Sequence, residues 1–154
     1  MKTYEQKIEK IKQAAEKREK RLLKRLQIAK GKPRKVGINA LKRELRRITH
    51  KIVRQSGSAC YVCDKPLPNP KDRTAGHYWS DGGHSAVRYS FDNLRISCVN
   101  CNSFKSGNLA EYGMRLEREL GHDNFEALGV LAHQTKRWER TELELLIEER
   151  KKLL

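Results

Sequence analysis

The chain has 154 residues, of which 34% are charged, 37% hydrophobic and only 6% aromatic. This length suits one compact domain with an appendage, and it excludes two full domains with separate large cores. The low apolar content predicts a small core that needs further support. A bound metal ion is one means of supplying that support.

Positive charge is concentrated at the start of the chain. Residues 1–56 hold 20 Lys or Arg against 5 Asp or Glu, whereas residues 57–154 hold 14 of each kind. Such a concentration is typical of a protein that binds a polyanion, because each neutralised phosphate releases condensed counterions. The alternative is a solvated basic helix that only keeps the protein soluble.

Membrane association is not expected from the sequence. No apolar run reaches the roughly 20 residues of a membrane span. The first residues, MKTYEQKIEK, also lack the apolar core of a signal peptide. We therefore expect a soluble, cytoplasmic protein.

Taken in chain order, the sequence predicts a mostly helical α+β fold. Residues 2–30 are rich in good helix formers and predict a long, weakly amphipathic helix that could pair with a copy of itself. GKPRKVG at 31–37 should end this helix. A second helix is expected over 38–55, with an apolar face of Leu41, Leu45, Ile48 and Ile52 and with Lys42, Arg43, Arg46, Arg47 and Arg54 on its other faces.

Turns and a hairpin are expected from Ser56 to about Arg95. Gly and Pro recur there, and AGHYW (75–79) and AVRYSF (86–91) are short β-prone pieces. Helices resume over 102–109, 111–120 and 124–134. A last helix should begin near Thr141, whose hydroxyl could cap it while Glu144 closes a capping box.

All four cysteines fall into two pairs, Cys60-x-x-Cys63 and Cys98-x-x-Cys101. Two such pairs bring four thiolates to a tetrahedral Zn²⁺ at about 2.3 Å each, and this closed shell indicates a structural metal. Two disulfides are the alternative, but cytosolic thiols stay reduced. The 34 residues between the pairs exceed the spacing of a plain zinc ribbon, which indicates an inserted unit.

The insert carries a recognisable order of residues. His77 lies in a β-prone segment, Asn93 precedes a short apolar strand, and Asn102 directly follows the second Cys pair. This order resembles the His-Asn-His (HNH) nucleases, in which a ββα unit holds one divalent metal and a phosphate. Its place between two Cys-x-x-Cys pairs is similar to that in phage endonuclease VII, a junction-resolving enzyme. AGHY, the Arg88-to-Asn93 spacing, CVNCN and KSGNL, with an Arg- and Glu-rich helical tail, resemble the phage lambda NinG (Rap) recombination family more closely.

This resemblance covers about residues 38–154. It implies a metal-dependent endonuclease that acts on branched DNA, such as Holliday junctions, during phage recombination in the bacterial cytoplasm. It also implies that the zinc site predicted from the cysteines clamps a ββα core over 38–110. Residues 1–37 are expected from their composition to form a basic helical extension, and residues 111–154 a helical region. Other phage recombination proteins are further candidate partners, and symmetric cutting of a four-way junction would suit a homodimer.

Phosphodiester hydrolysis explains the residue types. His77 is the candidate general base, because the ordinary pKa of histidine lies close to neutral pH. The resemblance assigns Asn102 to a catalytic Mg²⁺ or Mn²⁺, whose shell the phosphate oxygens complete. It assigns Asn93 a positioning role, in which its side chain connects the loop to the strand that bears His77. Phosphate contacts are expected from Arg88, Lys105, Lys42, Arg43, Arg46 and Arg47.

Gly76 departs from the wider nuclease pattern, in which an Asp precedes the catalytic His and binds the metal. In the NinG-like pattern this position also reads AGH, so Gly76 looks like a feature of that family. Asp72, Asp81 or Asp92 could supply the carboxylate, His84 could replace it, or His77 could itself be a ligand. If Gly76 instead marks lost chemistry, the chain is a non-catalytic zinc module that binds DNA or a recombination partner.

Several of these residues also have a plainer interpretation. Asn102 could cap the helix that leaves the second Cys pair, and His84 could be an exposed turn residue without a role. The tryptophans, Trp79 and Trp138, are interpreted as packing residues. The remaining histidines lie in predicted helices or at their ends and are interpreted as structural or solvent-facing: His50, His122 and His133.

Overall fold

The computed structural model describes residues 17, 20, 21 and 36–154. The chain divides into two units, Met1–Val36 and Gly37–Leu154. In the first unit, Lys17, Lys20 and Arg21 are helical and exposed. The helix expected over 2–30 and the linker expected over 31–37 otherwise lie outside the described residues.

The second unit is a mixed α/β fold that is mostly helical, as the sequence predicts, and its one sheet has two strands. Short 3-10 helices precede each strand, and a short π-helix follows the second. In chain order the elements are α2 Ile38–Gln55, η1 Pro70–Asp72, β1 Arg73–His77, η2 Phe91–Asn93, β2 Leu94–Cys98, η3 Asn100–Phe104, α3 Leu109–Leu120, α4 His122–Ala132 and α5 Arg140–Lys151.

β1 and β2 form an antiparallel pair in which Arg73 is opposite Cys98 and His77 is opposite Leu94. The strand expected after Asn93 is therefore confirmed. The β-prone interpretation of AVRYSF is wrong, because residues 86–91 form turns and the start of η2. Burial explains the misleading pattern, since Val87 and Tyr89 point into two different hydrophobic clusters rather than onto one face of a strand.

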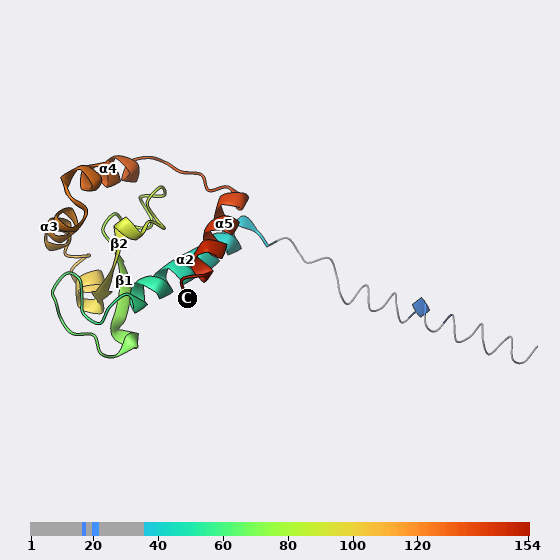
Figure 1. The fold of residues 1–154 in the computed structure, drawn as a ribbon, viewed down its shortest axis with the longest axis horizontal. Coiled ribbons are helices and arrows are strands. Elements are labelled where there is room, and N and C mark those ends of the chain that lie inside the picture. The colour runs from blue at the N-terminus through green and yellow to red at the C-terminus, as the bar shows by residue number, and fades with distance from the viewer. Residues whose placement is uncertain (1–16, 18–19, 22–35) are drawn as a thin grey trace, which may run out of the picture. The chain divides into compact units, whose positions relative to one another are not determined.

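The sheet lies between two helical layers (Figure 1). On one side, α3 and α4 contribute Tyr112, Leu116 and Leu128 to a hydrophobic cluster that includes three of the four cysteines. On the other side, α2 packs against α5, and Leu45 and Leu143 are fully buried in a second cluster. The site-bearing hairpin is thus supported from both sides.

The bounds of α2 and α5, the two helices of the second cluster, can be compared with those predicted from the sequence. α2 spans the expected residues 38–55, and its predicted apolar face is buried or partly buried. α5 begins at Arg140, slightly earlier than expected. Its capping box joins Glu139 and Glu142, since the side chain of Glu142 accepts a 2.9 Å hydrogen bond from the Glu139 backbone N–H. The interpretation of Thr141 and Glu144 as the capping pair is therefore wrong.

The segment after the second Cys pair is not the single helix expected over 102–109. η3 ends at Phe104, and Ser106, Gly107 and Asn108 then adopt positive φ angles of 48°, 89° and 49°. Three successive left-handed residues cannot continue a helix of L-amino acids, so the chain turns before α3 begins. α3 and α4 otherwise occur close to the positions that the sequence predicts.

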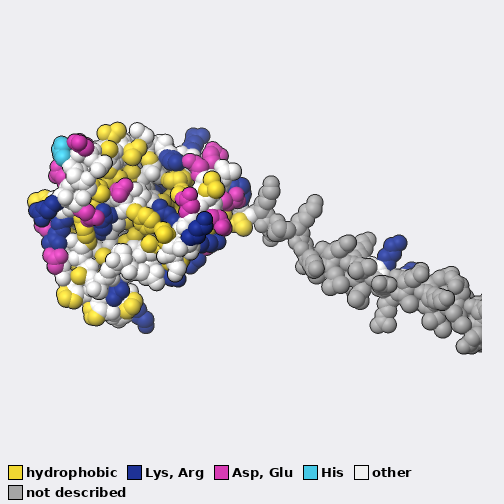
Figure 2. Space-filling view, in the orientation of Figure 1, with side chains coloured by type: hydrophobic (Ala, Val, Ile, Leu, Met, Phe, Trp, Pro, Cys, Tyr) yellow, Lys and Arg dark blue, Asp and Glu magenta, His cyan; other side chains and the backbone are white. Residues whose placement is uncertain are grey.

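The surface of the second unit mixes both signs of charge. On the face drawn in Figure 2, acidic and basic side chains are interspersed with hydrophobic ones. This agrees with the balanced charge of residues 57–154. None of the described helices combines the length and the hydropathy needed to cross a bilayer.

Candidate metal centre and active site

The four cysteines meet at one point of the fold. All four Sγ atoms lie within 4.8 Å of one another, and Cys63 Sγ and Cys98 Sγ are 3.9 Å apart. Thiolates that share a tetrahedral Zn²⁺ at about 2.3 Å are themselves about 3.8 Å apart. None of the cysteines forms a disulfide. The four thiols, Cys60, Cys63, Cys98 and Cys101, could therefore bind one zinc ion.

Backbone N–H groups near the cysteines favour the thiolate form, which is the form that binds a metal ion. The Cys101 N–H points at Cys98 Sγ at 3.3 Å. Burial disfavours the Cys60 thiolate, but backbone hydrogen bonds outweigh burial and lower the pKa of Cys60 to about 7. Arg115 fixes the first Cys pair to α3, because its guanidinium makes two 2.7 Å hydrogen bonds to the Asp64 carboxylate. The donor set and its surroundings fit zinc.

A cavity of about 450 Å³ lies between α2, β1 and the segment that begins with η3. β1 contributes His77 and η3 contributes Asn102, so the structure brings together two of the residues that the sequence singles out. The lining also contains several cationic or acid–base side chains. They include Arg46, His50 and Arg54 from α2, Arg73 from β1, and Asp81 from the loop that follows β1.

His77 is held in a defined tautomer. Its Nε2 lies 3.2 Å from the backbone carbonyl oxygen of Arg88. A carbonyl can only accept a hydrogen bond, so Nε2 carries the proton and Nδ1 keeps the lone pair. Burial lowers the pKa of His77, although this hydrogen bond and the Asp81 carboxylate oppose the shift. A neutral imidazole with a free lone pair suits a general base.

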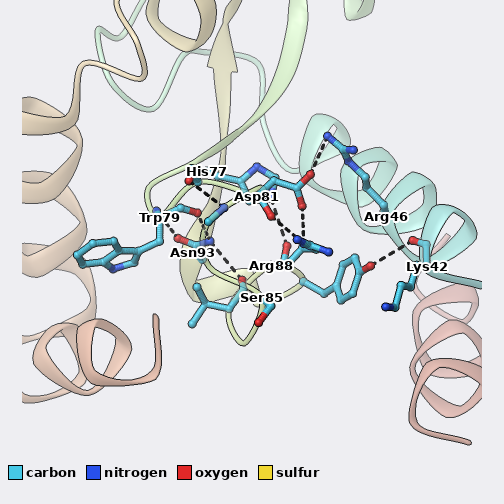
Figure 3. A network of polar contacts seen from close by, with 12 residues as sticks. Lys42, Arg46, His77, Trp79, Asp81, Ser85, Arg88 and Asn93 are labelled. Carbon is cyan, nitrogen blue, oxygen red and sulfur yellow. Dashed lines mark hydrogen bonds and ion pairs between the residues drawn. The ribbon is translucent and has the colours of Figure 1, made fainter. Parts of the chain in front are cut away.

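Asn93 is fully buried, and its side chain makes three hydrogen bonds. Its Oδ1 accepts from the Trp79 N–H at 2.7 Å, and its Nδ2 donates to the carbonyls of Trp79 and Val87 at 2.9 and 3.2 Å. These contacts join Asn93, at the end of the segment between β1 and β2, to Trp79, which lies just after His77 (Figure 3). Asn93 does not line the cavity, so its contacts position the site rather than touch a ligand there.

Gly76 and Asn102 approach each other closely. A Cβ placed on Gly76 would lie 2.5 Å from Ser97 Oγ and 3.2 Å from Asn102 Oδ1. A side chain at the position before His77 would therefore have to displace Ser97 and press on Asn102. Asn102 lies inside η3, whose N-cap is Val99, so the alternative interpretation of Asn102 as a helix cap is wrong.

Among the acids considered as substitutes for the missing carboxylate, Asp81 alone lines the cavity. Arg46 lies 2.9 Å from its Oδ2, and Arg88 lies 3.0 Å from its Oδ1 (Figure 3). Two guanidinium groups therefore neutralise this carboxylate. His84 lies outside the cavity, where its Nδ1 donates a 2.9 Å hydrogen bond to the Ala132 carbonyl. It is half-buried and bonded rather than a free turn residue.

The residues predicted to contact phosphate fall into two groups. Four of them line a second hollow of about 270 Å³, and this hollow shares Arg46 and Asp81 with the first cavity. The remaining two lie outside both hollows: Arg47 pairs with Glu44 at 2.9 Å, and Lys105 is exposed after η3. The four that line the second hollow are Lys42, Arg43, Arg46 and Arg88.

His50 was interpreted from the sequence as structural or solvent-facing, but it lines the cavity. Its ring lies edge-on to that of His77, with centroids 5.3 Å apart, and its Nε2 is buried without a hydrogen-bond partner. Burial, reinforced by the nearby His77 and Arg46, lowers the pKa of His50 to about 4. One signal was present in the sequence. Arg46, His50 and Arg54 follow at intervals of four, which places them on one face of a helix.

The family described as "Bacteriophage Lambda NinG protein" matches residues 1–154. The chain belongs to the NinG family. Proteins named "Protein ninG" from Escherichia phage lambda, Escherichia phage 933W and Enterobacteria phage H19B are each 33% identical to this NinG-family chain over 64 residues. Those 64 residues make up 42% of this chain and 31% of each relative, so the match spans about a third of the relatives' length. No solved structure matches the chain.

Proposed function

We propose that this NinG-family chain is a metal-dependent, structure-selective DNA endonuclease that acts on branched recombination intermediates such as Holliday junctions. One observation carries the proposal. A single cavity holds a neutral histidine, His77, an amide oxygen donor, Asn102, and guanidinium groups from two elements. This is the set of groups that hydrolysis of a phosphodiester needs.

Each residue has a defined task in this reaction. Nδ1 of His77 accepts the proton of the attacking water, while the Arg88 carbonyl keeps the ring in the required tautomer. Arg46 and Arg54 bind the negatively charged phosphate from α2. Asn102 is the protein ligand for Mg²⁺ or Mn²⁺. When bound, the cation supplies charge that stabilises the pentacoordinate phosphate and the leaving 3′ oxygen.

We also propose that β1, β2 and η3 form a ββα finger of the HNH type, clamped by zinc. The supporting observation is the order of elements: two antiparallel strands are followed at once by a short helix that carries Asn102. Cys98 ends β2 and Cys101 lies in η3, so a zinc ion at the cysteines would fix the strand-to-helix turn.

The two adjoining hollows suggest a path for DNA. Arg46 and Asp81 belong to both, so the cationic lining from α2 continues from the catalytic cavity into the second hollow. Lysine and arginine side chains arranged along a helix favour contacts to the phosphate backbone over base readout. A substrate chosen by DNA shape rather than by base sequence fits this lining.

Cleavage assays test the proposal. Zinc-loaded protein is incubated with labelled four-way junctions, or with duplex of the same sequence, in the presence of Mg²⁺ or Mn²⁺. We expect wild type to cut the junction in preference to the duplex. Replacing His77 by Ala should lower the rate by about 10²–10⁴-fold, as expected for loss of a general base. The matched control is His133→Ala, because His133 is exposed and does not line the cavity.

The non-catalytic alternative makes a different prediction for the same samples. The absence of a carboxylate at Gly76 favours it, and it expects salt-sensitive binding of the junction without any strand break. An intact junction after incubation with wild type would therefore overturn the nuclease proposal and support a zinc-stabilised DNA-binding module. Equal cutting by wild type and His77→Ala would refute the role of His77.

A further inference from the structure

His50 occupies a position that packing alone does not explain. It comes from α2, outside the segment between the two Cys pairs, yet its ring lies beside His77 and both rings line the cavity that holds Asn102. Two imidazoles with centroids 5.3 Å apart can act on one phosphodiester group. One would act through the attacking water and the other through a metal ion bound to the phosphate.

The Nε2 atom of His50 has an unmet bonding requirement. It is buried and has no hydrogen-bond partner within the described chain. Buried polar atoms in native proteins are almost always paired, so an orphaned ring nitrogen in a cavity indicates an absent partner. The neighbouring cavity residues on the same helix, Arg46 and Arg54, carry hydrogen-bond donors only.

The cation proposed at Asn102 lacks a second protein ligand. Gly76 has no side chain, and a Cβ there would lie 2.5 Å from Ser97 Oγ. The Asp81 carboxylate already lies within 3.0 Å of two guanidinium groups. Thr74 Oγ1 is occupied by a 2.8 Å hydrogen bond to the Ser97 carbonyl. Since the proposed function assigns His77 Nδ1 to the attacking water, His50 is the remaining imidazole in the lining of the cavity, and neutral imidazole is a common metal ligand.

We propose that His50 is a second protein ligand, with Asn102, for the divalent cation of this site. The inference rests on the proposed function in placing that cation at Asn102. Imidazole favours transition metals, whereas Mg²⁺ prefers an all-oxygen shell. His50 therefore biases the site toward Mn²⁺ over Mg²⁺, and α2 supplies a ligand in place of the carboxylate that is missing from β1 before His77.

Metal binding without DNA tests this assignment. The full zinc-loaded chain is titrated with Mn²⁺, and free Mn²⁺ is followed by electron paramagnetic resonance. We expect His50→Gln to weaken Mn²⁺ binding by at least about tenfold, while His133→Gln binds as wild type does. His50→Asp should restore binding and shift the preference toward Mg²⁺, because it replaces nitrogen by carboxylate oxygen.

A second measurement needs no substitution and so does not depend on how a variant folds. In wild type, low Mn²⁺ should broaden the ring-proton NMR signals of His50 and His77 before those of His133. The assignment is overturned if His133 broadens first, if His50→Gln retains Mn²⁺ affinity within about twofold, or if wild type binds no Mn²⁺. His50 Nε2 would then be paired only with water.

The outcomes separate this inference from the nuclease proposal. Mn²⁺ binding that depends on His50, with no strand cleavage by wild type, would leave the metal site standing and refute the nuclease. Cleavage by wild type with His50-independent Mn²⁺ binding would refute the ligand and leave the nuclease standing.

Discussion

Gly76 is the residue at which the geometry of the candidate site is tightest. Because its Cβ position is 2.5 Å from Ser97 Oγ and 3.2 Å from Asn102 Oδ1, Gly76→Ala should displace both side chains. We expect a loss of about 1–3 kcal/mol in the free energy of unfolding, typical of overpacking, together with weaker Mn²⁺ binding. Urea unfolding and Mn²⁺ titration measure the two effects.

Two variants serve as controls for this prediction. Gly82→Ala should change neither quantity, because nothing lies within 4 Å of a Cβ at Gly82. Adding Ser97→Ala to Gly76→Ala removes the 2.5 Å contact and should recover part of the stability. A Gly76→Ala variant as stable and as metal-competent as wild type would contradict the proposed crowding.

Asn93 provides a second prediction at the scale of one residue. Asn93→Ala would remove the hydrogen bonds of the partly buried Trp79 N–H and carbonyl to this side chain, and it would leave the Val87 carbonyl with only its bond from the Ser90 N–H. We expect unfolding to become easier by at least about 2 kcal/mol. Asn124→Ala is the matched control, since Asn124 is exposed and makes one hydrogen bond, to the Leu120 carbonyl. Chemical unfolding in the presence of zinc gives both values, and similar values for the two variants would contradict the prediction.

Residues differ in how well sequence alone identifies them. His77, Asn102 and the cysteines stand within one continuous pattern, so their order along the chain was enough to select them. His50 lies before the first Cys pair, and only the packing of α2 against β1 brings it to His77. The spacing of Arg46, His50 and Arg54 indicated a shared face, but no local signal identified what that face would meet.

At the scale of elements, α5 anchors α2 and thereby supports the wall of the cavity. Leu143 is fully buried in the cluster between these helices, whereas Leu145 on the same helix is 65% exposed. Leu143→Ala should therefore cost about 2–5 kcal/mol of stability, and Leu145→Ala should stay within about 0.5 kcal/mol of wild type. Thermal or urea unfolding of the two variants tests the packing, and equal losses would contradict it.

Elements were predictable where local and tertiary preferences agree. α2 has an apolar face at helical spacing, so its bounds of 38–55 follow from the sequence. The apolar residues of AVRYSF alternate as in a strand. Val87 and Tyr89 nevertheless pack into separate hydrophobic clusters, and the segment forms turns. The start of α5 depended on which acidic pair closes the capping box, and Glu139 with Glu142 closes it rather than Thr141 with Glu144.

For the whole molecule, zinc should stabilise one side of the fold more than the other. Cys60, Cys98 and Cys101 belong to the hydrophobic cluster that holds α3 and α4, whereas α2 and α5 share a separate cluster. Chelation under reducing conditions should first remove hydrogen-exchange protection from α3, α4 and the hairpin, and only later from the α2–α5 pair. Metal analysis should find about one zinc per chain. Uniform loss of protection, or a fold indifferent to strong chelators, would contradict a structural zinc site.

The distribution of charge also belongs to the whole molecule. The surplus of Lys and Arg lies within residues 1–56, and four basic residues of α2 in this segment line the two hollows: Lys42, Arg43, Arg46 and Arg54. This overlap between the basic segment and the cavity links DNA binding to catalysis in the proposed account. Composition predicted a polyanion partner, but only the fold places the α2 arginines beside His77.

The chemistry of the cut ends tests the nuclease claim most directly. Zinc-loaded wild type is mixed in excess with a labelled four-way junction and Mn²⁺, and the ends of any products are identified by mass spectrometry. Attack of water activated by His77, with the 3′ oxygen as leaving group, predicts nicks that carry a 5′-phosphate and a 3′-hydroxyl. His77→Ala should yield almost none. A junction that stays intact with wild type, or products with a 3′-phosphate, would contradict the account.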